Sequence, residues 1–167
     1  MKKLALLSAV AFVGLSAQAT AIASNTASGN ASATIVAAIN VAESTALKFG
    51  NVAAGASPGT VVVTTAGIRS NFGGAVLIPG GGEVQGIFDV TGAINANYAV
   101  ASPDGTTTTT LTGPGPAMTV DAFTTAHNTA LDGVGHDLLS VGATLHVAAN
   151  QTAGSYVGTY PVTVNYN

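Results

Sequence analysis

The chain closes with Gly154-Ser155-Tyr156-Val157-Gly158-Thr159-Tyr160-Pro161-Val162-Thr163-Val164-Asn165-Tyr166-Asn167. From Tyr156 onward every second residue is Tyr, Gly or Val, and the residues between them are mostly small or polar. A period of two gathers side chains on one face only in a β-strand. Because chain ends normally fray, a pattern this strong predicts a terminal strand at 156–166, held in a sheet, that either closes the fold or meets a partner.

Residues 1–19 have the pattern of a secretory signal peptide. Lys2 and Lys3 form a basic start, residues 4–15 are largely apolar, and Ala17-Gln18-Ala19 is a small-residue cleavage site. The apolar stretch is too short and too rich in Ala and Ser to be a membrane anchor, which needs about 20 apolar residues. We therefore expect an exported protein with no stable membrane span after signal cleavage.

The charge and cysteine content exclude several function classes. Without the signal peptide, Lys48 and Arg69 are the only strong bases, against seven Asp and Glu residues, so no basic face is available for nucleic acid. There is no Cys, and stability must come from burial and backbone pairing rather than from disulfides. So few charges do not suit a dense catalytic centre, and we expect a protein that is not an enzyme.

Alternation and turn signals predict one all-β domain. Residues 20–32 are expected to form a flexible lead segment before a single β-sandwich domain at 33–167. The first expected strand is 33–41, with Ile35, Ala37, Ile39 and Val41 on one face. Further strands are expected at 46–52, 60–65, 75–78, 84–90, 98–101, 106–111, 117–123, 138–147 and 156–166. Gly- and Pro-rich turns separate them, and residues 123–131 are either a loop or a single helical turn.

The residues that could bind a metal or a cofactor favour neither. The spacing of His127, His136 and His146 is unsuited to a shared metal site. Asp132-Gly133-Val134-Gly135-His136-Asp137 lacks the dense alternation of oxygen ligands found in a calcium loop. Pro79-Gly80-Gly81-Gly82 is followed by no Lys-Ser/Thr pair, so it is a hairpin turn rather than a phosphate loop. We expect no cofactor, and a hydrolase remains a third alternative only if His127 or His136 proves essential for an activity.

Residues 106–110 are a run of five threonines. Threonine has a high strand propensity, so a strand is the favoured interpretation. The alternative is an exposed run of hydroxyl groups that makes sugar or adhesive contacts.

Two stretches resemble a known family. Val141-Gly142-Ala143-Thr144-Leu145-His146-Val147, with the residues that follow it up to 166, is similar to the closing signature of DUF4402, an uncharacterised family of secreted bacterial β-sandwich proteins. Leu47-Lys48-Phe49-Gly50-Asn51-Val52 resembles its early L-x-F-G motif. The resemblance covers most of the mature chain and is most specific in its last thirty residues.

The C-terminus also resembles that of chaperone–usher pilins, whose last strand has a glycine fourteen residues from the end and a penultimate tyrosine. Gly154 and Tyr166 occupy these positions. The pilin resemblance implies an immunoglobulin-like antiparallel sandwich that is incomplete, with a groove filled by the N-terminal extension of an identical subunit. It also implies a periplasmic chaperone and an outer-membrane usher as further partners.

These observations lead to one functional expectation and one alternative. We expect a structural subunit of a surface fibre, located in the periplasm, on the cell surface or in a fimbrium, and assembled by β-strand donation. The expected donors are Ile35, Ala37, Ile39 and Val41, although the same residues could instead form the protein's own first strand. The expected groove and C-terminal strand residues are Gly154, Tyr156, Gly158, Tyr160, Val162, Val164 and Tyr166. The alternative is a self-complete secreted sandwich that binds a ligand or another envelope protein.

Overall fold

The computed structural model describes residues 25–167, so the expected signal peptide lies outside the described residues. Residues 25–34 belong to a separate unit that is exposed and contains no strand or helix. The folded unit comprises Ile35–Asn167. Its strands are β1 (Asn40–Thr45), β2 (Asn51–Val63), β3 (Arg69–Ile78), β4 (Gly86–Thr91), β5 (Tyr98–Ser102), β6 (Thr109–Leu111), β7 (Met118–Ala126), β8 (His136–Val147) and β9 (Thr163–Tyr166).

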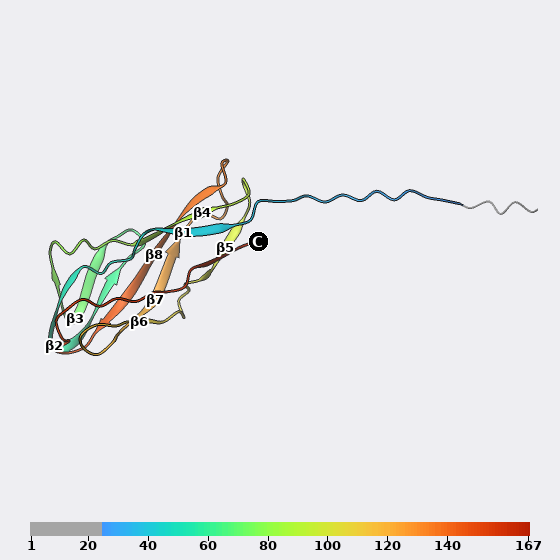
Figure 1. The fold of residues 1–167 in the computed structure, drawn as a ribbon. Coiled ribbons are helices and arrows are strands. Elements are labelled where there is room, and N and C mark those ends of the chain that lie inside the picture. The colour runs from blue at the N-terminus through green and yellow to red at the C-terminus, as the bar shows by residue number, and fades with distance from the viewer. Residues whose placement is uncertain (1–24) are drawn as a thin grey trace, which may run out of the picture. The chain divides into compact units, whose positions relative to one another are not determined.

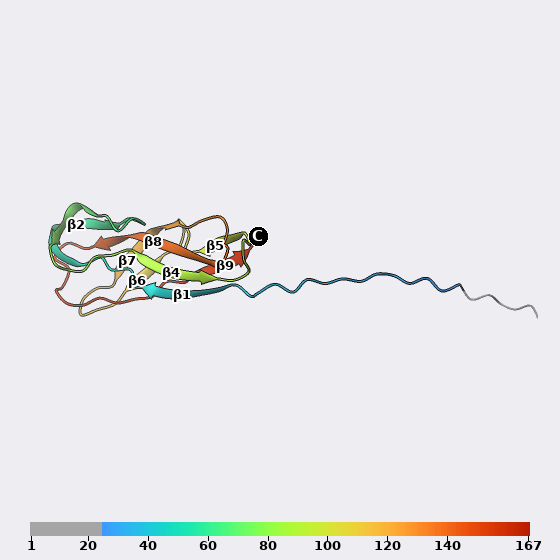
Figure 2. The same cartoon turned by 90° about the horizontal axis from the view of Figure 1, so that it is seen from above.

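Seven strands form one antiparallel sheet around β8, which runs through the middle of the fold (Figure 1). One edge of β8 pairs with β7, which in turn pairs with β6. The other edge pairs first with β4 and then with β2, and β1 and β3 lie outside these two strands. A second sheet consists of β5 and β9, which lie side by side at the end of the molecule that carries the C-terminus (Figure 2).

The core forms where alternating apolar side chains of the strands face inward. In β8 the inward side chains include Leu139, Val141, Leu145 and Val147, all buried, whereas Leu138, next to Leu139, is half exposed. This is the period of two that the sequence predicts for a strand with one buried face. No helix occurs among residues 25–167. The prediction of an all-β, antiparallel fold is therefore confirmed, and its arrangement is consistent with a β-sandwich.

The expected strand positions agree best in the middle of the fold. β4, β5 and β8 lie within two residues of the predicted ranges, whereas β2 and β3 begin well before them. Residues 123–131 contain no helical turn, because β7 continues to Ala126 and a loop follows. Of the threonine run, only Thr109 and Thr110 belong to a strand, β6. The carboxylate of Asp104 accepts backbone N–H groups from Thr106 and Thr107 and so closes a turn there.

The first and last predicted strands are wrong in extent. β1 begins at Asn40 rather than at residue 33, because its ladder with β4 starts at the pair of Asn40 and Thr91, and residues 33–39 pair with no strand in the described part of the chain. At the other end, the ladder covers only Thr163–Tyr166 instead of 156–166. Pro161 has no N–H to donate to a ladder, and Val157 makes only an isolated bridge with Thr112.

A buried carboxylate connects the two sheets. Asp137 of β8 accepts a hydrogen bond from the Tyr98 hydroxyl of β5 at 2.8 Å. It also accepts the backbone N–H of Asn128 at 2.8 Å and the side-chain amide of Asn128 at 2.7 Å. Burial alone would raise the pKa of Asp137, but the hydrogen bonds from Tyr98 and Asn128 outweigh it and leave the pKa below its usual value. The ionised form of Asp137 therefore stabilises the folded state.

Replacing Asp137 with Asn should lower the free energy of unfolding by about 1–3 kcal/mol at neutral pH, because the hydroxyl of Tyr98 loses a charged acceptor in a buried site. The matched control is Asp121→Asn, a partly exposed carboxylate that pairs with His146, and it should change stability by less than about 0.5 kcal/mol. Urea denaturation of both variants measures these changes. Equal effects of the two substitutions would contradict the role given to Asp137.

The same network predicts a pH dependence. A carboxylate whose pKa is depressed on folding contributes its full stabilisation above the unfolded pKa, here 3.8, and loses it as the pH falls through the folded value. The difference in stability between the wild type and Asp137→Asn should therefore be constant from pH 7 down to about 5 and should shrink as the pH falls below 3.8. Urea titrations at several pH values test this. A difference in stability that grows as the pH falls would contradict the direction assigned to the pKa of Asp137.

Candidate functional site

A groove of about 1090 Å³ opens within the folded unit beside the large sheet. Residues 46–54 form one wall, and residues 151–158 with Tyr160 form the other. The floor contains Met118 and Val120 of β7 and Leu145 and Val147 of β8. These four side chains are part of the hydrophobic core, so the groove leads directly to the core.

The groove exists because β2 is longer than its partner. Residues 59–63 of β2 pair with β8, but β8 ends at Val147. The first half of β2 keeps its pairing with β3 on one edge. On its other edge the N–H of Asn150 donates to the carbonyl of Gly55 at 2.9 Å. The strand edge facing the groove therefore lacks a ladder along residues 51–54.

The beginning of this wall is held by Arg69. Its guanidinium donates to the carbonyls of Phe49 at 3.0 Å and Asn51 at 3.2 Å, and pairs with Glu83 at 3.1 Å. Gly50 lies between the two carbonyls with a φ of 72°, a conformation that glycine adopts easily. A side chain at Gly50 would also collide with Arg69. The Leu-x-Phe-Gly stretch of the sequence is thus a wall of the groove, with Phe49 buried beneath it.

The opposite wall presents an unpaired backbone. Val157 bonds to Thr112 through both its N–H and its carbonyl, at 2.9 and 2.8 Å. Successive residues of an extended chain direct their backbone groups to opposite edges, so those of Tyr156 and Gly158 point away from Thr112. Neither residue has a backbone–backbone hydrogen bond within the part of the chain that the structure describes.

Two buried polar atoms at the groove also lack partners among the described residues. They are Oε1 of Gln151 and the hydroxyl of Tyr160. The amide nitrogen of Gln151 is satisfied by the Pro116 carbonyl and the Tyr156 hydroxyl. Burial, with a smaller effect of the charge on Glu43, raises the pKa of Tyr160 to about 12, so its hydroxyl stays protonated. Buried polar groups are normally hydrogen-bonded, so each of these two residues, which line the groove, carries a buried polar atom whose hydrogen bond is unmade among the described residues.

Aromatic contacts fix the position of Tyr160. Its ring packs against Phe88 and Phe123, with centroid distances of 6.1 and 5.0 Å. Its hydroxyl lies over Gly86, where an added Cβ would come within 2.5 Å of it. Glycine at position 86 is therefore required for this placement of Tyr160.

The C-terminal residues singled out from the sequence separate into two groups. Gly154, Tyr156, Gly158 and Tyr160 line the groove, whereas Val162, Val164 and Tyr166 are not among its lining residues. Val164 is buried and pairs with Val100 in the second sheet. The Tyr166 hydroxyl accepts the N–H of Ala93 at 2.6 Å and donates to the carbonyl of Ala37 at 2.9 Å. Tyr166 therefore fixes the end of the chain, away from the groove lining.

The four donor candidates do not behave as one strand. Ile35 is 96% exposed, and the carbonyl of Ala37 is held by Tyr166. Ile39 packs against the core. Val41 lies in β1 and pairs with Val90 of the same chain. In this structure Ile39 and Val41 therefore pack into the fold of their own chain. Ile35 is the large apolar residue of the four whose side chain stays exposed.

Sequence reasoning missed Gln151 and the floor of the groove. Gln151 follows the end of β8 and looks like an ordinary loop residue, so no signal points to its buried carbonyl oxygen. The floor residues fall within the expected strands 117–123 and 138–147, and their position beneath a groove depends on where β8 ends. The Leu-x-Phe-Gly motif is the one sequence signal that could have indicated the wall formed by residues 46–54.

The three histidines lie apart. His136 pairs with Asp89 at 3.2 Å, His146 pairs with Asp121 at 2.8 Å, and the ring of His127 packs against Tyr98. The described residues contain no group of three side chains suited to hold a metal. The Asp132 carboxylate accepts backbone N–H groups of its own turn, which lower its pKa. Within residues 25–167 no helix is long and apolar enough to cross a membrane.

Replacing Gly86 with Ala should destabilise the protein by about 1–3 kcal/mol, because the new methyl group overpacks the Tyr160 hydroxyl. In the Tyr160→Phe background the same substitution should cost measurably less, since the colliding atom is gone. Gly105→Ala is the matched control and should be nearly neutral, because no atom lies within 4 Å of its added Cβ. Thermal and urea unfolding of the double-mutant cycle measure this. Additive effects would show that Tyr160 does not lie over Gly86.

Comparison with known proteins gives one positive result. No curated protein and no solved structure matches the chain significantly. A family model, described as Domain of unknown function (DUF4402), matches residues 39–166. This span includes all nine strands and both walls of the groove. The chain therefore belongs to the DUF4402 family.

Proposed function

We propose that the protein is a structural subunit of a surface fibre whose groove receives a β-strand from an identical subunit. The observation that carries the proposal is the groove itself. Two chain segments flank a floor of core side chains, and parts of each segment, residues 51–54 of β2 and residues Tyr156 and Gly158, lack a backbone ladder on one edge within the described part of the chain. An added strand would pair with such edges and place alternate side chains on the floor. In this proposal the fold is a pilin-like, immunoglobulin-like sandwich that is incomplete by one strand.

The unpartnered polar atoms support a peptide as the occupant. Oε1 of Gln151 can accept a hydrogen bond, and the Tyr160 hydroxyl can donate one. A peptide backbone supplies both a donor and an acceptor at each residue other than proline. The groove has no basic or acidic cluster, and Lys48 is the one charged residue in its lining. It thus suits an uncharged extended chain better than a charged ligand.

The donor segment that we propose is the stretch preceding Ile39. Residues 25–38 are almost fully exposed and form no strand of their own. Ile35 and Val36 are 96% and 61% exposed, which is unfavourable for large apolar side chains. At about 3.3 Å per extended residue, these fourteen residues cover roughly 46 Å, which is enough to reach a neighbouring subunit. Of the original donor set, Ile35 and Ala37 remain in the proposal, and Ile39 and Val41 anchor the donor to its own subunit.

The rest of the functional expectation is part of the same proposal. We propose that the subunit is exported, that it performs no catalysis, and that it is found in the periplasm, on the cell surface or in a fimbrium. A periplasmic chaperone would protect the groove before assembly, and an outer-membrane usher would receive the subunits. The apolar floor and the unpaired edges supply the physical reason for a chaperone, because such edges promote unwanted pairing.

One observation favours the alternative, a self-complete secreted module. β1 already pairs with β4 of its own chain, and Tyr166 ties Ala37 to the C-terminus. These contacts close the N-terminal side of the fold without a partner. In that case the protein would remain monomeric and bind a ligand or another envelope protein through its surface.

The two functions are separated by the assembly state of the mature protein that begins at Thr20. We expect concentration-dependent polymers in size-exclusion chromatography with light scattering. Ile35→Asp should abolish them, because a buried charge in the groove is strongly unfavourable. Val36→Asp is the matched control and should still polymerise, because neighbouring residues of a strand face opposite sides. A wild type that stays monomeric at all concentrations, or equal effects of both variants, would exclude strand donation by this segment.

Hydrogen exchange tests where the donor binds. The amides of Tyr156 and Gly158 should exchange rapidly in the monomer and become protected in the polymer, because an added strand supplies their missing acceptors. The amide of Val157 is the internal control, since it already bonds to Thr112 and should be protected in both states. Mass spectrometry with residue-level fragmentation measures all three amides. Polymers in which Tyr156 and Gly158 remain unprotected would place the contact elsewhere.

A further inference from the structure

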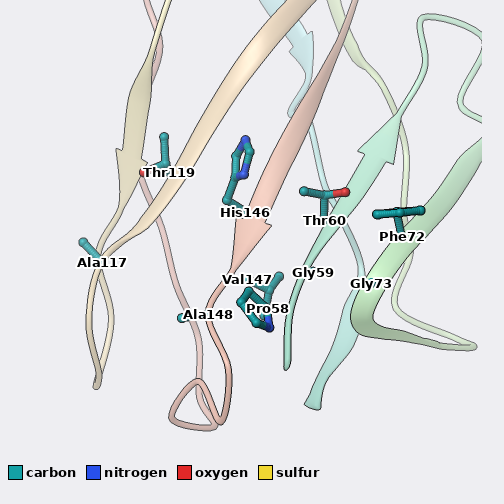
Figure 3. A pocket seen from close by; sticks show the side chains of 10 residues that line it. All are labelled: Pro58, Gly59, Thr60, Phe72, Gly73, Ala117, Thr119, His146, Val147 and Ala148. Carbon is teal, nitrogen blue, oxygen red and sulfur yellow. The ribbon is translucent and has the colours of Figure 1, made fainter. Parts of the chain in front are cut away.

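A row of five outward-facing side chains crosses the large sheet. Thr60 of β2 pairs with both Phe72 of β3 and His146 of β8. Val120 pairs with Leu145, which places Thr119 opposite His146, and Thr119 pairs with Thr110 of β6. Figure 3 shows four members of this row, Thr119, His146, Thr60 and Phe72, in line across neighbouring strands.

The row lies on the outer face of the sheet. Val61, Val120 and Leu145 alternate with its members and are buried in the core, so the row side chains point the other way. Adjacent strands are about 4.8 Å apart, and five strands therefore give a row roughly 19 Å long. We call these five residues the outer row.

A hollow of about 400 Å³ lies over the outer row. The side next to Phe72 is bare backbone, because Gly59 and Gly73 occupy it. A Cβ at Gly59 would collide with the backbone of β3, and Gly73 has a φ of 69°. Glycine is therefore required at both positions, and the surface beside the Phe72 ring is open.

Phe72 is the aromatic ring that the described part of the chain leaves most open to water. It is 81% exposed, and it is the one aromatic among the large apolar side chains that are exposed in residues 25–167. An exposed ring next to a hollow is characteristic of a contact surface rather than of packing. A ring face of this kind binds the apolar face of a flat partner.

The polar members of the outer row are oriented for hydrogen bonding. Nε2 of His146 lies 2.8 Å from the Asp121 carboxylate, which fixes the imidazole and leaves Nδ1 without a hydrogen-bond partner among the described residues. Each threonine hydroxyl can both donate and accept. His146 is the one titratable side chain among the ten residues that line the hollow. The surface thus combines an apolar platform with hydrogen-bonding groups.

We propose that the outer row binds a neutral oligosaccharide that lies across the strands. One sugar ring stacks its C–H face on Phe72, and hydroxyl groups of the following rings bond to Thr60, His146 and Thr119. A sugar chain has both the apolar face and the dense hydroxyl groups that this surface complements. An added peptide strand would need free backbone edges, which the middle of a sheet lacks, and nucleic acid would need cationic side chains.

The oligosaccharide site is independent of the fibre proposal. Thr119 and His146 lie on the same strands as the groove floor but face the opposite side of the sheet. A substitution in the outer row should therefore leave polymerisation unchanged, and Ile35→Asp should leave sugar binding unchanged. Failure of one proposal can thus be distinguished from failure of the other.

Isothermal titration of the mature protein with cellohexaose, maltohexaose and chitohexaose tests the site. We expect at least one of the three to bind with a Kd of about 1 mM or lower. Phe72→Ala should weaken that binding about tenfold by removing the stacking platform. Thr119→Val should weaken it by a smaller factor, because it removes one hydroxyl group and keeps the shape of the side chain.

Val134→Ala is the control, because Val134 is 82% exposed but lies in a loop outside the outer row. It should leave the affinity unchanged, and the melting temperatures of Phe72→Ala and Val134→Ala should match that of the wild type. The proposal is overturned if none of the three sugars binds, or if Phe72→Ala binds as well as the control. It is also overturned if Phe72→Ala abolishes a dimer while no sugar binds, since the face would then be a contact between copies of the chain.

Discussion

Backbone pairing along β8 is the constraint on which the rest of the fold depends. β7 occupies one edge of this strand, and β4 and β2 share the other edge end to end. The register of β2, β4 and β7 is therefore set by their pairing with β8. Because side chains alternate, a shift of β8 by one residue would turn Leu139, Val141 and Leu145 outward. The chain has no cysteine, so nothing covalent would hold the sheet if this register were lost.

The same strand determines where the groove opens. β8 stops at Val147, whereas β2 continues past this point with its edge uncovered. The chain then returns through residues 151–158 without pairing with β2, and the groove lies between these two segments. Tyr160 and Gly86 set the position of the returning segment, and Tyr166 fixes its end. The groove is therefore built by strand length and by the anchoring of the C-terminal segment, and not by a special loop.

The sequence predicts side-chain burial better than backbone pairing. β8 and β4 are predicted within two residues because a one-sided core imposes strict alternation on both strands. The C-terminal segment has an equally strict alternation, and Tyr160 and Val164 do pack inward. Its ladder is nevertheless limited to β9, because the pattern records which side chains face the core and not whether a partner backbone lies alongside. For the same reason the pattern identifies Tyr156 and Tyr160 at the groove, while Gln151 and the free edge of β2 follow only from tertiary structure.

The energetics of the groove favour hydrogen bonding over apolar burial as the source of affinity for an added strand. The walls already shield the floor, and Val120, Leu145 and Val147 are only 2%, 4% and 5% exposed. An entering Ile35 would bury its own surface, worth about 1.5–3 kcal/mol, but it would remove little further water from the floor. The larger change is the pairing of the open edges of the two walls and of the buried atoms of Gln151 and Tyr160, where an unmade hydrogen bond costs about 1–3 kcal/mol. Under the proposed function, a subunit with this groove would be stable while empty and would still favour a strand, so that assembly would depend on the supply of donor segments and not on rescue of an unfolded chain.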